Sequence, residues 1–123
     1  MNRQELDKYI TDTYFATAEY LWESAPSFAV YRHQNGGKWF AVIMEIPRSK
    51  IGLRGEKPVN VVNLKCDPIL IGSLLLEDGI HRGYHMNKNH WITVRLDGSV
   101  EKSQLQALID ISFELTAKKN KVK

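Results

Sequence analysis

The chain has 123 residues and a mass of 14.1 kDa, the size of one domain, and its 43% of hydrophobic residues is enough for one core. It has no apolar run long enough to cross a bilayer and no signal-peptide core near Met1. Its single cysteine, Cys66, cannot form an internal disulfide. We therefore expect one cytoplasmic domain over residues 1–117, with no membrane association.

The formal charge of +3 favours an acidic partner such as nucleic acid, but the charge is unevenly placed. Four lysines lie in a basic tail, residues 118–123, and without them 13 basic residues face 14 acidic ones. The remaining excess collects in two segments. Residues 47–57 hold Arg48, Lys50, Arg54 and Lys57 against Glu56 alone, and residues 80–95 hold Arg82, Lys88 and Arg95 with no acid.

The first helix is expected to begin near Arg3, with Asn2 as its N-cap, and to end at residues 13–15, where threonines weaken helix propensity. A single helix through Trp22 fits the periodicity too. The residues up to Ser27 then form a connection to the first strand.

The clearest predicted hairpin joins residues 28–32 to residues 38–46 through a turn at 35–37, and Pro47 is expected to end its second strand. Residues 48–57, with two glycines and four basic residues, predict an exposed loop or an irregular wing. Alternating residues over 59–65 predict a third strand.

At Asp67-Pro68 the sequence indicates a helix start, because Asp caps free backbone N–H groups and Pro suits the first helical position. The predicted helix, residues 68–77, is apolar nearly all round, so we expect it to be largely buried, with Gly79 as its C-terminal cap. A strand at 91–96, a turn at 97–99 and a last helix at 101–119 follow.

The predicted element order is therefore α-β-β-β-α-β-α. Hairpins give antiparallel pairs, and three helices are too few to cover both faces of a sheet. The sequence predicts the α+β class: a single two-layer domain with a twisted antiparallel sheet and helices on one face.

Several blocks of the chain resemble one known family. The motif Tyr-His-Met-Asn-Lys-x-His-Trp at residues 84–91, followed by Leu-Asp-Gly at 96–98, is similar to the signature of the MmcQ/YjbR family of small bacterial proteins. Residues 38–44, 63–68 and 111–116 resemble further blocks in the family's order. The resemblance implies a CyaY-like fold and a proposed double-wing mode of DNA binding, with no established catalysis.

The family's most distinctive positions are all matched here. They are Tyr84, His85, Met86, Asn87, Lys88, His90 and Trp91. Some of them are suited to bracing the loop, through hydrogen bonds from His85, Asn87 and His90 to backbone groups. Tyr84 and Trp91 are able to stack on bases, although a strand position favours core packing for Trp91.

The sequence therefore predicts a non-enzymatic protein that binds DNA phosphates through basic loops. Phosphate binding needs cations that the DNA can reach, but it needs no fixed spacing between them. The predicted contact residues are Arg48, Lys50, Arg54, Lys57, Arg82, Lys88 and His90. An alternative remains open: an adaptor that recognises an acidic protein or a small anionic ligand at residues 84–91.

Metal and thiol chemistry are weaker interpretations. His81, His85 and His90 with Cys66 make a zinc-like donor set, but their spacing is not a usual ligand pattern. Cys66 precedes a helix start that would favour a thiolate nucleophile, whereas the neighbouring Asp67 opposes one. No glycine-rich phosphate motif is present. We expect no metal, no cofactor and no catalytic residue.

Overall fold

The computed structural model describes residues 1–34 and 36–117, so the predicted basic tail lies outside the described residues. The helices among them are α1 (Arg3–Tyr14), α2 (Pro68–Leu74) and α3 (Lys102–Thr116), with a short 3-10 helix, η1 (Arg48–Ile51). The strands are β1 (Ala29–Arg32), β2 (Trp39–Pro47), β3 (Pro58–Lys65), β4 (Ile80–Arg82) and β5 (Trp91–Arg95).

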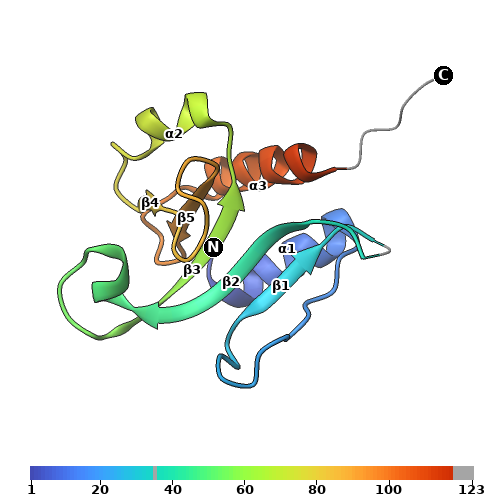
Figure 1. Ribbon diagram of the computed structural model, residues 1–123, viewed down its shortest axis with the longest axis horizontal. Coiled ribbons are helices and arrows are strands. Elements are labelled where there is room, and N and C mark those ends of the chain that lie inside the picture. The colour runs from blue at the N-terminus through green and yellow to red at the C-terminus, as the bar shows by residue number, and fades with distance from the viewer. Residues whose placement is uncertain (35, 118–123) are drawn as a thin grey trace.

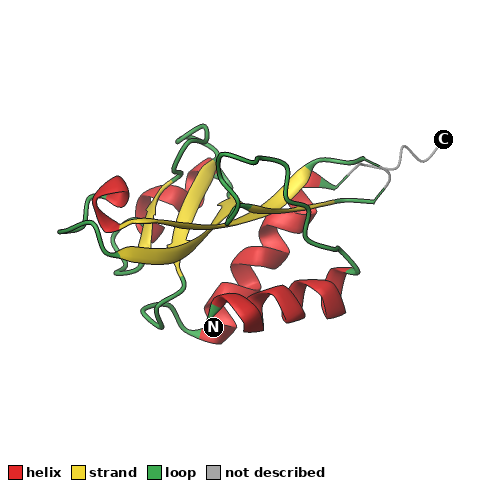
Figure 2. Cartoon of the chain, turned by 90° about the horizontal axis from the view of Figure 1, so that it is seen from below, coloured by secondary structure: helices red, strands yellow, loops and turns green. Residues whose placement is uncertain are grey.

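The strands form one antiparallel sheet in the order β1-β2-β3-β5-β4 (Figure 1). Helices α1 and α3 pack on one face, whereas mainly loops cover the other (Figure 2). We call this second side the open face. The predicted α+β class, with an antiparallel sheet and helices on one face, is confirmed.

Helix α1 has the start and the end that its sequence predicts. The Asn2 side chain accepts a hydrogen bond from the Glu5 N–H at 2.9 Å, and Glu5 Oε1 accepts one from the Asn2 N–H at 2.9 Å. This capping box satisfies two backbone donors at once. The helix ends at Phe15, which takes a left-handed conformation with φ of 57°. The alternative of one helix through Trp22 is wrong, because Glu19 pairs with Val30 as a bridge beside β1.

The hairpin of β1 and β2 carries a shift in register that decides which residues enter the main core. Tyr31 lies opposite Ala41, whereas Arg32 lies opposite Trp39, so Phe40 is an extra residue on β2. As a result Phe40 and Ala41 both join the core beneath α1 and α3, and Trp39 packs on the open face. Buried Ser112 of α3 locks this arrangement, donating to the Phe40 carbonyl and accepting from the Lys65 N–H at 2.8 Å.

Two details of the predicted order are corrected. Strand β4, which has three residues and pairs with β5, was not predicted, because so short a segment has no detectable alternation. Helix α2 ends at Leu74 with Leu75 as its C-cap, so Gly79 is not the cap and instead precedes β4.

The prediction that α2 is largely buried is also wrong. Only Ile71 of this helix is buried, whereas Ile69 and, just beyond the helix, Leu76 are 86% and 88% exposed. The helix lies at one end of the sheet rather than beneath it (Figure 1), so Ile69 stays exposed, whereas Leu74 and, just beyond the helix, Leu75 pack against the main core.

The open face has a hydrophobic cluster of its own. Its buried members are Val30, Val42, Met44, Ile46, Val59 and Val61. Phe28, Trp39, Ile51 and Tyr84 pack against them. These partners come mainly from the connections around the sheet, so loops rather than helices close this side. The loop predicted at 48–57, called here the η1 loop, begins with η1 and supplies Ile51 to this cluster.

Candidate functional site

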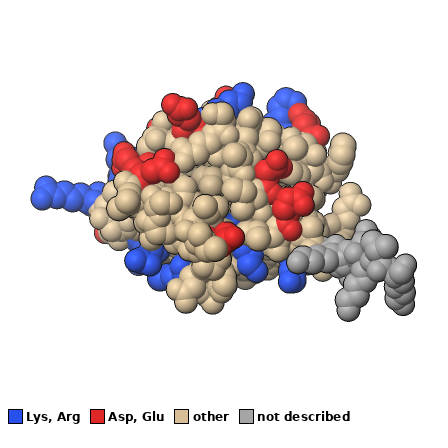
Figure 3. Space-filling model, turned by 90° about the horizontal axis from the view of Figure 1, so that it is seen from above, with Lys and Arg blue, Asp and Glu red and all other residues tan. Residues whose placement is uncertain are grey.

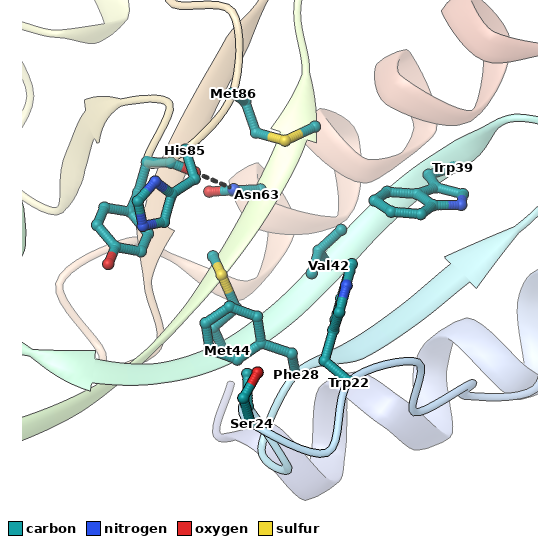
Figure 4. A pocket seen from close by; sticks show the side chains of 11 residues that line it. Trp22, Ser24, Phe28, Trp39, Val42, Met44, Asn63, His85 and Met86 are labelled. Atoms are coloured by element: carbon teal, nitrogen blue, oxygen red, sulfur yellow. Dashed lines mark hydrogen bonds between the residues drawn. The ribbon is translucent and has the colours of Figure 1, made fainter.

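A cavity of about 280 Å³ lies on the open face, and we call it the open-face pocket (Figure 4). It is lined by Trp22, Ser24, Ala25, Phe28, Trp39, Val42, Met44, Asn63, Tyr84, His85 and Met86. The strands β2 and β3 supply its floor. The connection that precedes β1 and the loop at residues 83–90, called here the signature loop, supply its walls.

Aromatic rings and methionines dominate the lining. The Trp22 ring is nearly perpendicular to the rings of Trp39 and Phe28, at centroid distances of 5.6 and 6.0 Å. Met44 and Met86 extend towards the cavity from opposite sides in Figure 4. Among the lining residues none is Asp, Glu, Lys or Arg. The pocket therefore favours a neutral, flat or apolar group over a small anion.

The signature loop is fastened to the sheet at Tyr84. Asn63 and Thr93 are neighbours across β3 and β5, and the Thr93 hydroxyl donates to Asn63 Oδ1. The Asn63 amide donates to the Tyr84 carbonyl at 2.8 Å, the bond drawn in Figure 4, and the Tyr84 N–H donates to Thr93 Oγ1 at 2.8 Å. Both backbone groups of Tyr84 are thus paired with side chains that the sheet holds rigidly.

Beyond Tyr84 the loop is braced by its own residues. The Lys88 ammonium donates to the Gly83 carbonyl at 2.8 Å, and Asn87 Oδ1 accepts from the Asn89 N–H at 2.9 Å. The expected bracing role is therefore confirmed for Asn87. The side chains of His85 and His90 make no hydrogen bond to any described residue, so that expectation is wrong for the two histidines.

The loop also contains a strained residue at the pocket wall. His85 has a φ of 58°, in the left-handed region that few residues other than glycine adopt, and its ring lies 4.0 Å from that of Tyr84. The loop starts at Gly83, where an added Cβ would lie 2.8 Å from the Cβ of Trp91. Trp91 itself is half-buried at the start of β5. Such local strain is often found at binding sites.

The predicted basic residues form two separate groups, one near each end of β3. The η1 loop leads directly into Pro58, the first residue of β3. At the other end Lys65 pairs with Trp91, the residue that follows the signature loop. Eight residues of strand place these two ends roughly 23 Å apart. Arg82 and Lys88 lie together in a shallow hollow beside α2.

Most of these cations are available to a partner. Lys50, Arg54, Lys57, Arg82 and Lys88 are exposed, and none forms an ion pair with a described carboxylate. Figure 3 shows basic side chains at the left, where the η1 loop lies in Figure 1, and along the lower edge; at the upper edge basic and acidic side chains lie side by side, and acidic ones occupy the middle of that view.

Arg48 and His90 differ from the other predicted contact residues. Arg48 is half-buried, and its Nη1 is buried without a hydrogen-bond partner among the described residues, so this guanidinium is held within the base of the η1 loop. The His90 side chain is exposed, and its backbone carbonyl accepts from the Cys66 N–H at 2.8 Å.

The remaining titratable candidates are buried in ways that disfavour their charged forms. Cys66 is 2% exposed, and burial, followed by the neighbouring Asp67, raises the pKa of its thiol. His81 lies opposite Thr93, and burial, followed by nearby Arg95, lowers the pKa of its imidazole. Within residues 1–34 and 36–117, no three His, Cys, Asp or Glu side chains are placed to share a metal ion.

Sequence reasoning found only the signature-loop part of this site. It missed Trp22, Phe28, Trp39, Met44 and Asn63, which come from three other segments of the chain. One signal was present: Asn63 is an uncharged polar residue in the middle of an apolar strand, where an unpaired amide would be costly.

The chain is similar to known proteins both in sequence and in structure. The uncharacterised protein YyaQ of Bacillus subtilis (strain 168) is 34% identical over 116 residues, covering 94% of this chain and 98% of YyaQ. The uncharacterised protein YbdF of Escherichia coli O157:H7 is 38% identical over 100 residues, covering 79% of this chain and 70% of YbdF.

Solved structures are also similar. A crystal structure of a protein from Pseudomonas syringae has a TM-score of 0.92 at 45% identity, covering 95% of this chain and all of that one. DR2400 of Deinococcus radiodurans, with a TM-score of 0.74 at 24% identity, shares the fold. No described helix is long and apolar enough to span a membrane. The model of the YjbR family matches residues 3–115, and the chain belongs to that family.

Proposed function

We propose that this protein binds DNA without catalysing a reaction, and that the two basic groups near the ends of β3 contact the phosphates. The observation that carries this proposal is the pairing pattern of the charges: the exposed cations of both groups have no carboxylate partner among the described residues. Unpaired, exposed cations release bound counterions from phosphates at little cost to the protein.

The spacing of the two groups supports an extended ligand. The β3 strand between the two groups is roughly 23 Å long, so a ligand that contacts both groups has to be extended. A small anion would contact only one group at a time, whereas an extended phosphate backbone is long enough to contact both. This arrangement fits the double-wing mode that the resemblance implies.

Fluorescence anisotropy with a labelled duplex at several salt concentrations tests the proposal. The double variant Lys50→Ala/Arg54→Ala should weaken binding and reduce the slope of log affinity against log salt by about 1 to 2, since each lost phosphate contact contributes about 0.9. The matched control is Lys8→Ala/Lys102→Ala, which removes the same charge from the helical side. A form ending at Ala117 tests whether residues 118–123 carry the binding.

Equal losses in both double variants would show that only net charge matters, and the proposed surface would be wrong. Binding that disappears in the form ending at Ala117 would assign it to the tail. Absence of binding by the full chain at low salt would reject the proposal outright.

A second candidate function is recognition of a partner protein at the signature loop, favoured by the apolar lining that Tyr84 and Met86 give the open-face pocket. An exposed apolar pocket of this kind suits a hydrophobic side chain of a partner. Binding of that type would be insensitive to Lys50→Ala/Arg54→Ala and to salt, and it would be lost in Met86→Ala.

A further inference from the structure

We infer that the open-face pocket receives one unstacked base of a single-stranded nucleic acid, while the two basic groups hold the phosphates on either side of it. This inference rests on the proposed nucleic-acid binding, and it goes beyond it by naming the strand state of the ligand and the residues that contact a base.

The size of the pocket limits what it can hold. A volume of about 280 Å³ lies just below the roughly 300 to 1,000 Å³ of sites for drug-sized ligands. One flat ring system fits such a space, whereas a longer ligand would have to extend out of it. A nucleotide meets this condition, because its base enters the pocket and its sugar and phosphate stay outside.

The chemistry of the walls selects a neutral ring. Trp22 stands nearly perpendicular to both Trp39 and Phe28, so these rings meet edge to face and do not stack on one another. The sulfurs of Met44 and Met86 are polarisable and make favourable contacts with aromatic rings. Stacking on aromatic side chains is the means by which proteins hold single-stranded bases without strong sequence preference.

The charges around the pocket place phosphates at its sides. No lining residue is charged, whereas Lys50 and Arg54 lie in the loop before β3, and Arg82, at the end of β4, and Lys88, in the signature loop, lie near the other end of β3. A strand crossing the open face from one group to the other would pass over the pocket. In a duplex the bases are stacked and paired inside the helix, so one would have to be flipped out at a cost of a few kcal/mol.

The polar atoms of the pocket predict weak discrimination between bases. The Asn63 amide is committed to Tyr84 and Thr93 and is only 1% exposed. The side chains of Ser24 and His85 are both exposed. These exposed side chains allow a preference among bases but not a strict code.

The test compares three ligands by fluorescence anisotropy at one low salt concentration. They are an oligothymidine of about 12 nucleotides, the same strand with abasic sites in place of its central bases, and a duplex of equal length. The three protein forms are the wild type, Trp22→Ala in the pocket wall and Tyr20→Ala as a matched control. Tyr20 is an exposed aromatic residue of the same connection that does not line the pocket. Trp22 is itself 37% exposed, so its replacement leaves the core intact.

The wild type should bind oligothymidine about 5- to 150-fold more tightly than the abasic strand, the factor that stacking of one base contributes. Trp22→Ala should lose most of this difference while keeping the affinity for the abasic strand, and Tyr20→Ala should behave as the wild type. Oligothymidine should also quench the tryptophan emission, whereas the abasic strand should not.

Two outcomes would overturn the inference, and they are distinguishable. Equal affinity for all three ligands, with unchanged salt dependence, would leave phosphate binding in place. The pocket would then be assigned to the second candidate function, the binding of a partner's apolar side chain. Failure to bind any of the three ligands would remove the proposed function together with the base site.

Discussion

Asn63 of β3 and Thr93 of β5 face each other across the sheet, and together they hold both backbone polar groups of Tyr84. The two side chains are almost fully buried, at 1% and 0% exposure, and bonded to each other. A buried amide and hydroxyl would be costly in an apolar sheet if they were unpaired. Here their hydrogen bonds offset the cost of burial. The same bonds fix the loop that forms one wall of the open-face pocket.

Replacing either member of this pair should destabilise the fold and loosen the loop. We expect Asn63→Leu and Thr93→Val each to cost about 1 to 3 kcal/mol, because each leaves buried partners unsatisfied. The double variant should cost less than the sum of the two, since the residues act as one network. Urea unfolding measures the energies, and faster amide exchange across residues 83–90 reports the loop. Additive energies would contradict the network.

Ser112 of α3 should contribute more to the stability of the fold than the small size of its side chain suggests. Its hydroxyl bridges the Phe40 carbonyl of β2 and the Lys65 N–H of β3, and it is fully buried. Ser112→Ala leaves two buried backbone groups without their partner, so we expect a loss of about 1 to 3 kcal/mol in the free energy of unfolding. Ser103→Ala, at an exposed position in the same helix, is the matched control and should change stability by less than about 0.5 kcal/mol.

Helix α2 and the turn that follows it should tolerate charge at their exposed apolar positions. Ile69→Lys and Leu76→Lys should each change the free energy of unfolding by less than about 0.5 kcal/mol, because both side chains are already in water. Ile71→Ala should cost about 2 to 5 kcal/mol, because Ile71 joins the main core. Thermal or urea unfolding compares the three. A large loss from either lysine variant would mean that a partner surface covers α2 in solution.

His81 should make stability depend on pH in the weakly acidic range. Burial and Arg95 lower the pKa of this imidazole below its ordinary 6.5, while Asp78 and Asp97 oppose the shift. As the pH falls below about 6.5, the unfolded chain binds a proton at His81 that the folded chain does not, so stability decreases. The decrease continues until the pH reaches the lowered folded pKa.

Urea unfolding at about pH 7 and about pH 5.5 measures this loss. It should be smaller in His81→Gln, which keeps a polar side chain without the titration. His90→Gln serves as the control, because its ring is exposed, and should retain the wild-type dependence. The same loss in all three proteins would assign the pH dependence to other groups.

Cys66 should be unreactive in the folded protein. Its thiol is 2% exposed, and burial and Asp67 raise its pKa, so the nucleophilic thiolate is scarce at neutral pH. A thiol reagent such as a nitrobenzoate disulfide should modify it slowly in buffer and rapidly in denaturant. Fast modification of the native protein would reopen the possibility of thiol chemistry.

The sequence by itself determined most of the elements, because their signals are local. The Asn2 and Glu5 capping box, the Asp67-Pro68 helix start and the apolar alternation of β3 each depend on neighbouring residues. The signature at residues 84–91 also identified the family. These features require no knowledge of what lies across the fold.

The tertiary structure alone decided what these elements bury and what they bring together. Periodicity shows that α2 is apolar but not that it lies at the end of the sheet, where Ile69 stays exposed. It cannot place Trp22, Trp39 and Met86 around one pocket, since these residues meet only when two separate connections close over β2 and β3 on one sheet face. The pocket and the distance between the two basic groups are long-range properties, because strand order and register set them. The local pattern of residues along the chain does not show them.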